Sequence, residues 1–372
     1  MGEIYRRPNK DQCGAEAPRS DAMQANSRRA WEERLQAEGM PNGMPGRKRL
    51  GRRRAKKIAV AIGVCLLVAI VGLGAWLFYF NNQINANLQD FAAGDLEALR
   101  GILQAPASAD SPYYVLVVGT DSRGSSDPER SDTIMLCRID PVKKQTSILS
   151  IPRDVKIELP GYGAQKINAA MVYGGPDGSG GPAGVVMAVS NFVGVPISHY
   201  VQIDFSGFRK IIDALGGVTV TVPAYTYYDG ISLQPGKQKL NGKQALVFAR
   251  CRKTYATGDF QRAANQRQLM KVVAQEILGS PPTEMPGLIT SISECVRTDL
   301  TASGILQIAD RMRGMNTASD MSAGQVPCTA SYISGVSYDL PDADKWPAVR
   351  RKFIDGVVPF VSDSEKQPGV DE

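Results

Sequence analysis

Three apolar stretches decide the fold of this chain: YYVLVVG at 113–119, TIMLCRI at 133–139 and TSILSI at 146–151. Each is short and rich in β-branched or aromatic residues, which is typical of strands buried in a sheet. Further along, HYVQI at 199–203 is another predicted strand, and FSGFRKIIDAL at 205–215 has the periodicity of an amphipathic helix. Because strands and helices alternate, we predict an α/β domain with a central mixed sheet flanked by helices.

One transmembrane helix is predicted upstream of this domain. Residues 58–80 read IAVAIGVCLLVAIVGLGAWLFYF and contain no charged side chain. As a helix they would be about 34 Å long, enough to cross a bilayer core of about 30 Å. The basic run RKRLGRRRAKK at 47–57 directly precedes the span, so the positive-inside rule predicts a cytoplasmic N-terminus. A cleaved signal peptide is the alternative, but the long leader and long apolar run argue against it.

The expected organisation is that of a single-pass cell-membrane protein with an extracellular domain. Residues 1–57 carry 15 Lys and Arg against 7 Asp and Glu, whereas the whole chain has a net charge of +6. The basicity therefore belongs to the tail and does not indicate nucleic-acid binding by the main domain. The predicted segments are a disordered basic tail at 1–57, a transmembrane helix at 58–80, an extracellular stalk at 81–111, a folded main domain at 112–360 and a polar tail at 361–372.

The densest cluster of charge lies at 250–268, which reads RCRKTYATGDFQRAANQRQ. Arginine guanidinium groups bind a multiply charged oxyanion such as pyrophosphate through paired hydrogen bonds. On a helix that begins at Asp259, the side chains of Asp259, Arg262 and Gln266 share one face. If the upstream segment is extended, Arg250 and Arg252 also point the same way. A solvated basic surface is the alternative interpretation of this cluster.

Charged side chains also follow the ends of the first and third predicted strands. Asp121 and Asp132 flank the loop after the first strand, and Arg153 follows the third. In a mostly parallel sheet such loops gather at one edge, which is the usual place for a ligand. The two aspartates are candidate Mg²⁺ ligands, because Mg²⁺ prefers a few carboxylates together with phosphate oxygens. Taken alone, the same aspartates are also typical of turns and helix caps.

Cysteine and histidine usage excludes several kinds of chemistry. Cys137, Cys251, Cys295 and Cys328 would all be extracellular, where disulfides persist, and four cysteines allow three connectivities. Among these we favour a Cys295–Cys328 disulfide, with Cys137 on a core strand as a candidate buried thiol. The only histidine, His199, opens a predicted strand, so we expect a structural role. The Ser-His-Asp and zinc-hydrolase chemistries therefore fit poorly.

Seven blocks of sequence resemble the LytR-CpsA-Psr family of cell-envelope proteins. They lie in order between residues 113 and 280: VLVVGTDSR, RSDTIML, LSIPRDV, KINAAMVYGG, GFRKIIDALGGV, LNGKQALVFARCR and DFQRAANQRQ. The arrangement of tail, apolar span and external domain also fits this family. The resemblance implies an α/β fold with a lipid-accepting groove. It also implies a phosphotransferase that moves a glycopolymer phosphate from a polyprenyl-pyrophosphate carrier to a sugar hydroxyl of peptidoglycan.

The resemblance also assigns roles to individual residues. Asp121 and Asp132 would hold Mg²⁺, with Mn²⁺ as an alternative metal, and Asp259 would orient the arginines or help activate the acceptor hydroxyl. The implied catalytic residues are Arg153, Arg250, Arg252, Asp259, Arg262 and Gln266. The implied substrate-binding residues are Arg130, Lys166, Asn168, Asn265 and Arg267. At position 265 the family often has Arg, and Arg267 is a candidate to compensate for Asn265.

Three other functions stay open on the sequence. The glycan acceptor could be a surface protein, or water could be the acceptor, which would make the protein a lipid-pyrophosphate pyrophosphatase. A non-catalytic envelope regulator belongs to a different class. No nucleic-acid partner is expected, because the basic tail lacks a helix-turn-helix pattern.

Overall fold

The computed structural model describes residues 29–31, 33, 34, 37 and 52–357, except 121–130, 179, 253, 256, 257 and 282. The predicted polar tail, and nearly all of the predicted basic tail, therefore lie outside the described residues. The chain divides into two compact units, residues 1–72 and 73–372. The helix α2 (Arg52–Leu88) runs through both, and its segment Leu67–Leu88 is long and apolar enough to cross a membrane.

A six-stranded mixed sheet forms the centre of the second unit, which confirms the predicted fold class. Its order is β11-β6-β1-β2-β3-β12, with antiparallel pairs β11–β6, β1–β2 and β2–β3 and parallel pairs β6–β1 and β3–β12. The strands are β1 (Tyr113–Thr120), β2 (Ser131–Asp140), β3 (Gln145–Ile151), β6 (His199–Asp204), β11 (Val296–Thr298) and β12 (Met321–Gln325).

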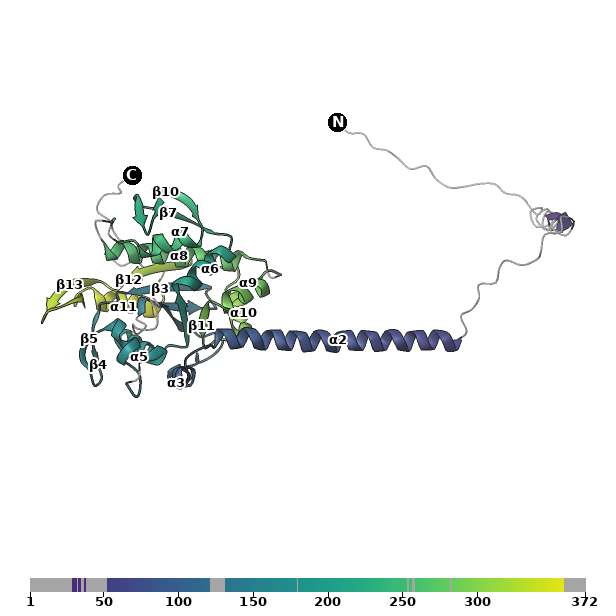
Figure 1. Ribbon diagram of the computed structural model, residues 1–372, viewed down its shortest axis with the longest axis horizontal. Helices are drawn as coiled ribbons and strands as arrows, with labels where there is room; N and C mark the ends of the chain where they lie inside the picture. Colours follow the sequence, from purple (N-terminus) through teal and green to yellow (C-terminus); the bar gives the residue numbers. More distant parts are fainter. Residues whose placement is uncertain are drawn as a thin grey trace, which may run out of the picture. The chain divides into compact units, whose positions relative to one another are not determined.

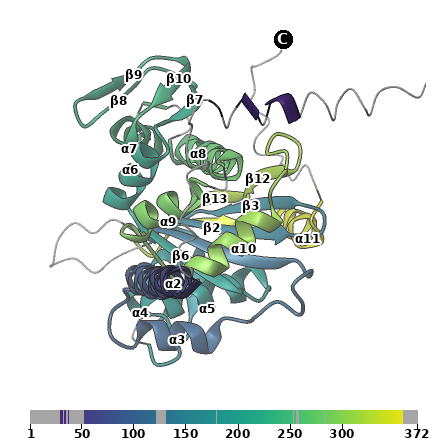
Figure 2. The same cartoon turned by 90° about the vertical axis from the view of Figure 1, so that its right-hand side faces the viewer.

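Helices cover both faces of this sheet (Figures 1 and 2). On one face, α5 (Gly181–Val193) packs with α3 (Asp95–Ile102) and α11 (Trp346–Asp355) in the largest hydrophobic cluster. On the other face lie α8 (Asp259–Gly279) and α10 (Ala302–Arg311). The short helices η1 (Ile167–Ala169) and α4 (Ala170–Tyr173) lead into α5, and α9 (Met285–Ser293) precedes β11.

A second, smaller core lies beside α8. It is formed by α6 (Phe205–Ala214), α7 (Gly242–Arg250) and two two-stranded sheets, β7 (Val218–Val222) with β10 (Gly236–Leu240) and the hairpin β8 (Thr226–Tyr228) with β9 (Ile231–Leu233). Two further hairpins are β4 (Lys156–Leu159) with β5 (Gly163–Lys166) and β13 (Cys328–Ile333) with β14 (Val336–Pro341).

Side-chain caps explain where two of these helices begin. Asp204 Oδ1 accepts a hydrogen bond from Gly207 N at 2.6 Å, which caps α6. Asn241 and Gln244 form a reciprocal capping box at the start of α7, with both hydrogen bonds at 3.0 Å. The predicted helix at 205–215 is therefore confirmed.

The segment predicted as a stalk is partly built into the domain. Ile84 and Leu88, on the last turns of α2, are buried against α6, α9, β11 and α10. Asn85 Oδ1 also accepts a hydrogen bond from Ala302 N at 2.8 Å, at the start of α10. Leu99 of α3 is fully buried in the largest cluster. Residues 81–103 are therefore part of the folded unit, because their apolar side chains find partners there.

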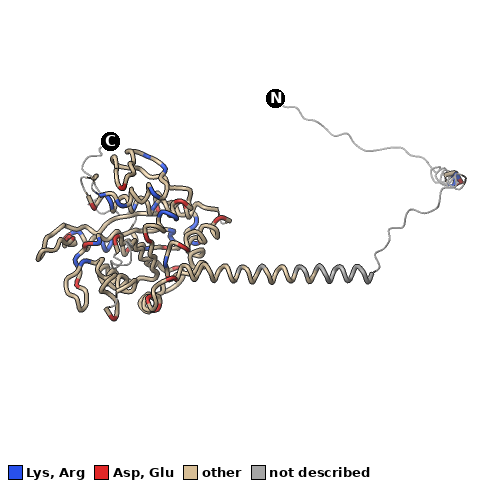
Figure 3. The backbone as a smooth tube through the Cα atoms, viewed as in Figure 1, with Lys and Arg blue, Asp and Glu red and all other residues tan. Residues whose placement is uncertain are grey.

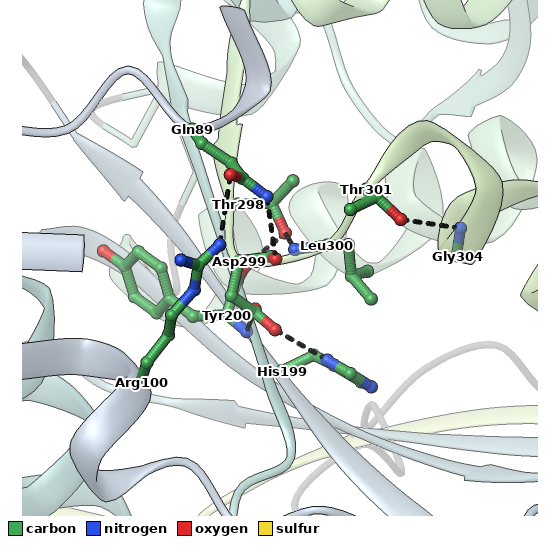
Figure 4. Close-up of polar contacts among 9 residues, drawn as sticks. All are labelled: Gln89, Arg100, His199, Tyr200, Thr298, Asp299, Leu300, Thr301 and Gly304. Carbon is green, nitrogen blue, oxygen red and sulfur yellow. Dashed lines mark hydrogen bonds and ion pairs between the residues drawn. The ribbon is translucent and has the colours of Figure 1, made fainter. Parts of the chain in front are cut away.

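Asp299 joins the end of α2 to the sheet (Figure 4). Its carboxylate accepts a hydrogen bond from Tyr200 N at 2.7 Å, and Oδ2 lies 2.8 Å from His199 Nδ1. Gln89 Nε2 donates to the carbonyl oxygen of Asp299 at 3.3 Å, and Arg100 donates to Gln89 Oε1 at 3.1 Å. His199 thus has the structural role that its sequence position suggests.

The predicted disulfide does not form. Cys137, Cys251, Cys295 and Cys328 are all free thiols. Cys295 packs beside α9 and α10, whereas Cys328 packs against the opposite hydrophobic cluster. Burial raises the pKa of Cys137 to about 12, as expected of an inert buried thiol.

Candidate functional site

Strand pairing brings Asp132 and Arg153 together at one edge of the sheet. Asp132 is the second residue of β2, and Arg153 lies two residues beyond β3. The antiparallel register pairs Ile134 with Ile151, so the start of β2 meets the end of β3. Arg153 Nη1 donates to Asp132 Oδ1 at 2.5 Å. The strands at this edge are antiparallel and not mostly parallel as predicted from the sequence. Because β1 is antiparallel to β2 and β2 is antiparallel to β3, the end of β1, the start of β2 and the end of β3 lie at the same edge of the sheet.

A second ion pair lies next to the first. Arg153 Nε is 3.6 Å from Asp154 Oδ2, and Lys166 Nζ is 2.8 Å from Asp154 Oδ1. Lys166 is held there by the β4–β5 hairpin, which pairs it with Lys156 directly after the Arg153–Val155 segment. The predicted neighbour Asn168 is buried, and its backbone N donates to the carbonyl oxygen of Arg153 at 3.2 Å.

The helices α7 and α8 provide the other arginines. Arg250 is the last residue of α7, Cys251 is buried, and Arg252 follows it. On α8, Arg262 Nη2 donates to Asp259 Oδ2 at 2.8 Å. One turn further along, Gln266 Nε2 donates to the carbonyl oxygen of Ala249 at 3.1 Å, which fastens α8 to the end of α7.

One cavity of about 390 Å³ collects these groups. Its charged end is lined by Asp132, Arg153, Arg250, Arg252, Arg262 and Gln266. The rest of its lining is mainly apolar and comes from β1, β2, β6, α6, α7 and α8, with side chains such as Val117, Met135, Phe208, Leu269 and Val273. Arg250 bridges the two environments, because its guanidinium lies 4.4 Å from the ring centre of Phe205.

The charged end is an electrostatically coupled cluster. Burial acts to lower the pKa of Arg153, but the hydrogen bond and charge of Asp132, with Asp154 and Asp259, raise it above its ordinary value. Burial lowers the pKa of Arg262, and the positive charges of Arg153 and Arg252 act in the same direction. Repulsion among half-buried guanidinium groups favours the binding of an anion between them.

Unsatisfied polar atoms concentrate at this end of the cavity. Across the described residues, five buried side-chain N or O atoms make no hydrogen bond, and four of them belong to Thr120, Ser131, Arg153 and Arg262. Thr120 and Ser131 are paired across β1 and β2, next to the predicted metal ligands. Buried polar groups normally have partners, so the unsatisfied Nε atoms of Arg153 and Arg262, which line the cavity, indicate where a ligand binds.

The residues fit a Mg²⁺ ion as far as they are described. The charged end of the cavity contributes the carboxylate of Asp132. The described residues contain no group of three or more acidic, cysteine or histidine side chains that would hold a metal. That donor set suits Mg²⁺, which binds one or two carboxylates together with water and substrate phosphate oxygens. The predicted residues Asp121 and Arg130 lie outside the described residues.

Two predicted substrate ligands bind protein partners instead. Asn265 is buried, and its Nδ2 donates to the carbonyl oxygen of Phe248 at 3.1 Å and to Tyr255 OH at 3.2 Å. Arg267 is also buried, and its Nη1 donates to Gln325 Oε1 of β12 at 3.0 Å. Neither side chain lines the cavity, so we assign both to the framework behind the arginines.

Neither Asp339 nor the apolar lining of the cavity is predicted from the sequence. Asp339 N donates to the carbonyl oxygen of Asp154 at 2.9 Å, which brings β14 beside the charged end. Burial, together with the charges of Asp154 and Asp259, raises the pKa of Asp339. No charged motif surrounds Asp339 in the sequence. The apolar lining could not be distinguished from ordinary core residues.

This fold and site define an α/β domain with an arginine-rich anion site that opens onto an apolar cavity. The profile of the LytR_cpsA_psr family matches residues 78–353, and the chain belongs to this LytR-CpsA-Psr family. Figure 3 shows acidic and basic residues spread over the whole domain, so the arginine cluster is not part of a uniformly basic surface.

Relatives with assigned activities cover most of the chain. The TagU protein of Halalkalibacterium halodurans, a polyisoprenyl-teichoic acid–peptidoglycan teichoic acid transferase, is 35% identical over 290 residues, which are 76% of this chain and 92% of that protein. TagU of Bacillus subtilis is 27% identical over 293 residues, 78% of this chain and 93% of the relative.

Solved structures share the fold. The crystal structure of TagV from B. subtilis has a TM-score of 0.60 and 28% identity, and the match covers 67% of this chain and 98% of that chain. A structure of TagT bound to LIIa-WTA has a TM-score of 0.54 and 23% identity, with 66% and 91% coverage. The latter similarity supports the fold.

Proposed function

We propose that this protein is a membrane-anchored phosphotransferase that moves a glycopolymer phosphate from a polyprenyl-pyrophosphate carrier to a sugar hydroxyl of peptidoglycan. The observation that carries the proposal is the single cavity with an arginine-rich end and an apolar remainder. Such a cavity is complementary to one kind of molecule, an anion attached to a long hydrocarbon. The teichoic acid transferases among its relatives act on a polyisoprenyl-linked polymer and peptidoglycan.

The arginines supply most of the chemistry in this proposal. Arg153, Arg252 and Arg262 bind the pyrophosphate oxygens and neutralise the charge that develops on them during transfer. The acceptor hydroxyl oxygen forms a bond to the phosphorus on the glycan side. The bond from that phosphorus to the bridging oxygen breaks, and polyprenyl phosphate leaves. A carboxylate at the edge of the site takes the hydroxyl proton, and Asp259 is our candidate because it is held beside Arg262.

Mg²⁺ is the metal that we propose for this site, with Asp121 and Asp132 as its ligands. When bound, Mg²⁺ would neutralise pyrophosphate charge beside the arginines. Asp132 already holds Arg153 by a hydrogen bond, so the same carboxylate would set the positions of both cations. We expect chelation to abolish transfer by the purified protein and added Mg²⁺ to restore it.

The orientation of the chain follows from the same proposal. The basic run before the apolar segment favours a cytoplasmic N-terminus, which leaves the folded unit on the outer face of the membrane. Polyprenyl-linked polymers and peptidoglycan would both be reached there. A cysteine introduced into the folded unit should react with an impermeant thiol reagent on intact cells.

Reconstitution tests the activity directly. The full-length protein in detergent is incubated with a synthetic polyprenyl-pyrophosphate glycan, peptidoglycan fragments and Mg²⁺, and the products are analysed by mass spectrometry. A covalent glycan–phosphate–peptidoglycan product is the expected result. Free phosphorylated glycan with no peptidoglycan adduct would instead identify a pyrophosphatase and overturn the proposal. Omitting the peptidoglycan fragments and adding a surface protein tests the protein-acceptor alternative.

A further inference from the structure

A second hollow, of about 280 Å³, adjoins the main cavity. It shares Tyr228, Leu246 and Arg250 with the main cavity. Its walls come from α6, α7 and the β8–β9 hairpin. Apart from the shared Arg250, no charged residue of this hollow has a role in the site described above.

The hollow is cationic. Arg209 of α6 and Lys243 and Arg250 of α7 face it, against one carboxylate, Asp229. Lys243, Leu246, Val247 and Arg250 recur at the spacing of one helix face, so α7 directs both of its cations to the same side.

The Nε atom of Arg209 is buried and has no hydrogen-bond partner. In the described part of the chain, five buried side-chain polar atoms make no hydrogen bond. Two of them, Arg153 Nε and Arg262 Nε, belong to residues that line the main cavity, and a third is Arg209 Nε. A buried N–H without an acceptor costs free energy unless a ligand supplies one. The same signal that marks the pyrophosphate end of the cavity therefore marks this hollow.

The walls of the hollow are held in place. Gly242 N donates to Asp213 Oδ1 at 2.7 Å, which fastens the start of α7 to α6. Asp229 and Gly230 both have positive φ angles, 51° and 76°, as required for the tight turn between β8 and β9. Arg250 also lies over the ring of Tyr228, at 5.3 Å from its centre. A preorganised cationic hollow of this kind binds an anion at a lower ordering cost than a flexible one.

We infer that this hollow is a second anion subsite, which binds a phosphodiester group in the glycopolymer of the donor, beyond the pyrophosphate. The inference rests on the proposed function. The shared residue Arg250 joins the two hollows, so an anion bound here belongs to the same donor molecule as the pyrophosphate. The subsite would make the protein selective for polyanionic glycopolymers over uncharged ones.

The test compares two donors with the same polyprenyl pyrophosphate. One carries a phosphodiester-containing glycan and the other an uncharged glycan of equal length. We expect Arg209→Ala and Lys243→Ala each to raise the KM for the charged donor about tenfold relative to the uncharged donor, the size of one lost charge-assisted hydrogen bond. Lys237→Ala removes the same charge from an exposed position on β10 and should leave the ratio unchanged.

The outcomes are distinguishable. Equal KM changes for both donors, or none, would overturn the subsite. Arg209→Lys, which keeps the charge but loses the paired N–H groups, should recover part of the preference. Lys243 is exposed, so its variant should fold normally even if Arg209→Ala does not.

Two direct binding measurements test the subsite when no transfer is observed and when a lipid headgroup is the bound anion. Calorimetry with a soluble phosphodiester glycan tests the subsite even if wild-type protein transfers neither donor, a result that would refute only the proposed function. Binding to phosphatidylglycerol vesicles separates a lipid headgroup from the polymer. A loss of vesicle binding in Arg209→Ala without a change in glycan binding would reject the inference.

Discussion

The two ends of the main cavity differ in how far their side chains are satisfied by protein contacts alone. The charged end holds Asp132, Arg153 and Arg262 in ion pairs whose buried N–H groups are still incompletely satisfied. The apolar end is lined by side chains such as Met135 and Leu269, which have no polar group to satisfy. It resembles the hydrophobic core around it. The charged end therefore depends on a ligand for its full set of interactions, whereas the apolar end offers volume and shape.

Removing one arginine from the charged end should have the largest effect. We expect Arg262→Ala to lower kcat by about 10²- to 10³-fold, because one donor to the developing phosphoryl charge is lost. Arg252→Ala should behave similarly. The measurement is transfer by the purified protein at saturating Mg²⁺, together with its melting temperature.

The control for this prediction is Arg351→Ala, an exposed arginine on α11, which should keep full activity. If Arg252→Ala and Arg262→Ala both retain wild-type kcat, the charged end is not the reaction centre. A loss of activity accompanied by unfolding would show a structural role instead.

The charged end was largely predictable from the sequence, and the reason is chemical. Arg250, Arg252 and Arg262 lie within one short stretch, and a helix starting at Asp259 places Arg262 and Gln266 on one face. Both of these residues line the cavity. When charged residues occur at regular spacing next to predicted strands and helices, local geometry alone predicts which of them share a face.

The apolar end was not predictable, because its residues have the same pattern as core residues. Leu269 and Val273 occur at helical spacing on α8, and that spacing predicts burial whether they face protein or a cavity. Only the packing of α6 and α8 above the sheet decides between the two. The pairing of β2 with β3 likewise depends on long-range register, which a single sequence does not reveal.

Filling the apolar end should separate its role from that of the charged end. We expect Val273→Phe to lower kcat/KM about tenfold for a long polyprenyl donor and much less for a short-chain donor, because buried hydrocarbon contact is lost. The comparison of two donor chain lengths is the measurement. Val272→Phe is the matched control, because Val272 packs in the neighbouring core and does not line the cavity.

If Val273→Phe affects both donors equally, the apolar end does not bind the lipid. An equal fall in the control variant would show that overpacking of α8 is responsible. Arginine binding of the pyrophosphate should persist in Val273→Phe, so the product ratio of transfer to hydrolysis should not change.

Asn265 tests whether the framework behind the charged end is separate from ligand binding. We expect Asn265→Ala to cost about 1–3 kcal/mol of stability, because the Phe248 carbonyl and Tyr255 hydroxyl groups lose a donor. The donor KM should change little, since Asn265 does not line the cavity. Chemical denaturation and donor titration measure the two effects. Gln261→Ala, which removes a contact to Asn265 Oδ1 and leaves both Asn265 Nδ2 hydrogen bonds in place, should cost less.

Asp339 gives the smallest expected effect, on how stability depends on pH. Burial, followed by the charges of Asp154 and Asp259, raises the pKa of its carboxyl group above the ordinary value of 3.8. Between the two values the folded protein holds a proton that the unfolded chain has lost. This contribution therefore favours folding at low pH and is lost as the pH rises through the folded-state pKa.

Asp339→Asn removes the buried charge at neutral pH, so the variant should be more stable than wild type at pH 7. The difference should shrink as the pH falls from 7 toward 4, because the raised pKa lets the wild-type carboxyl take up its proton at a higher pH in the folded protein than in the unfolded chain. Denaturation at both pH values measures the change, with the exposed Asp344→Asn as control. A stability difference that is the same at both pH values would mean that Asp339 acts through hydrogen bonding. In that case the negative charges of Asp154 and Asp259 would have no part in the effect.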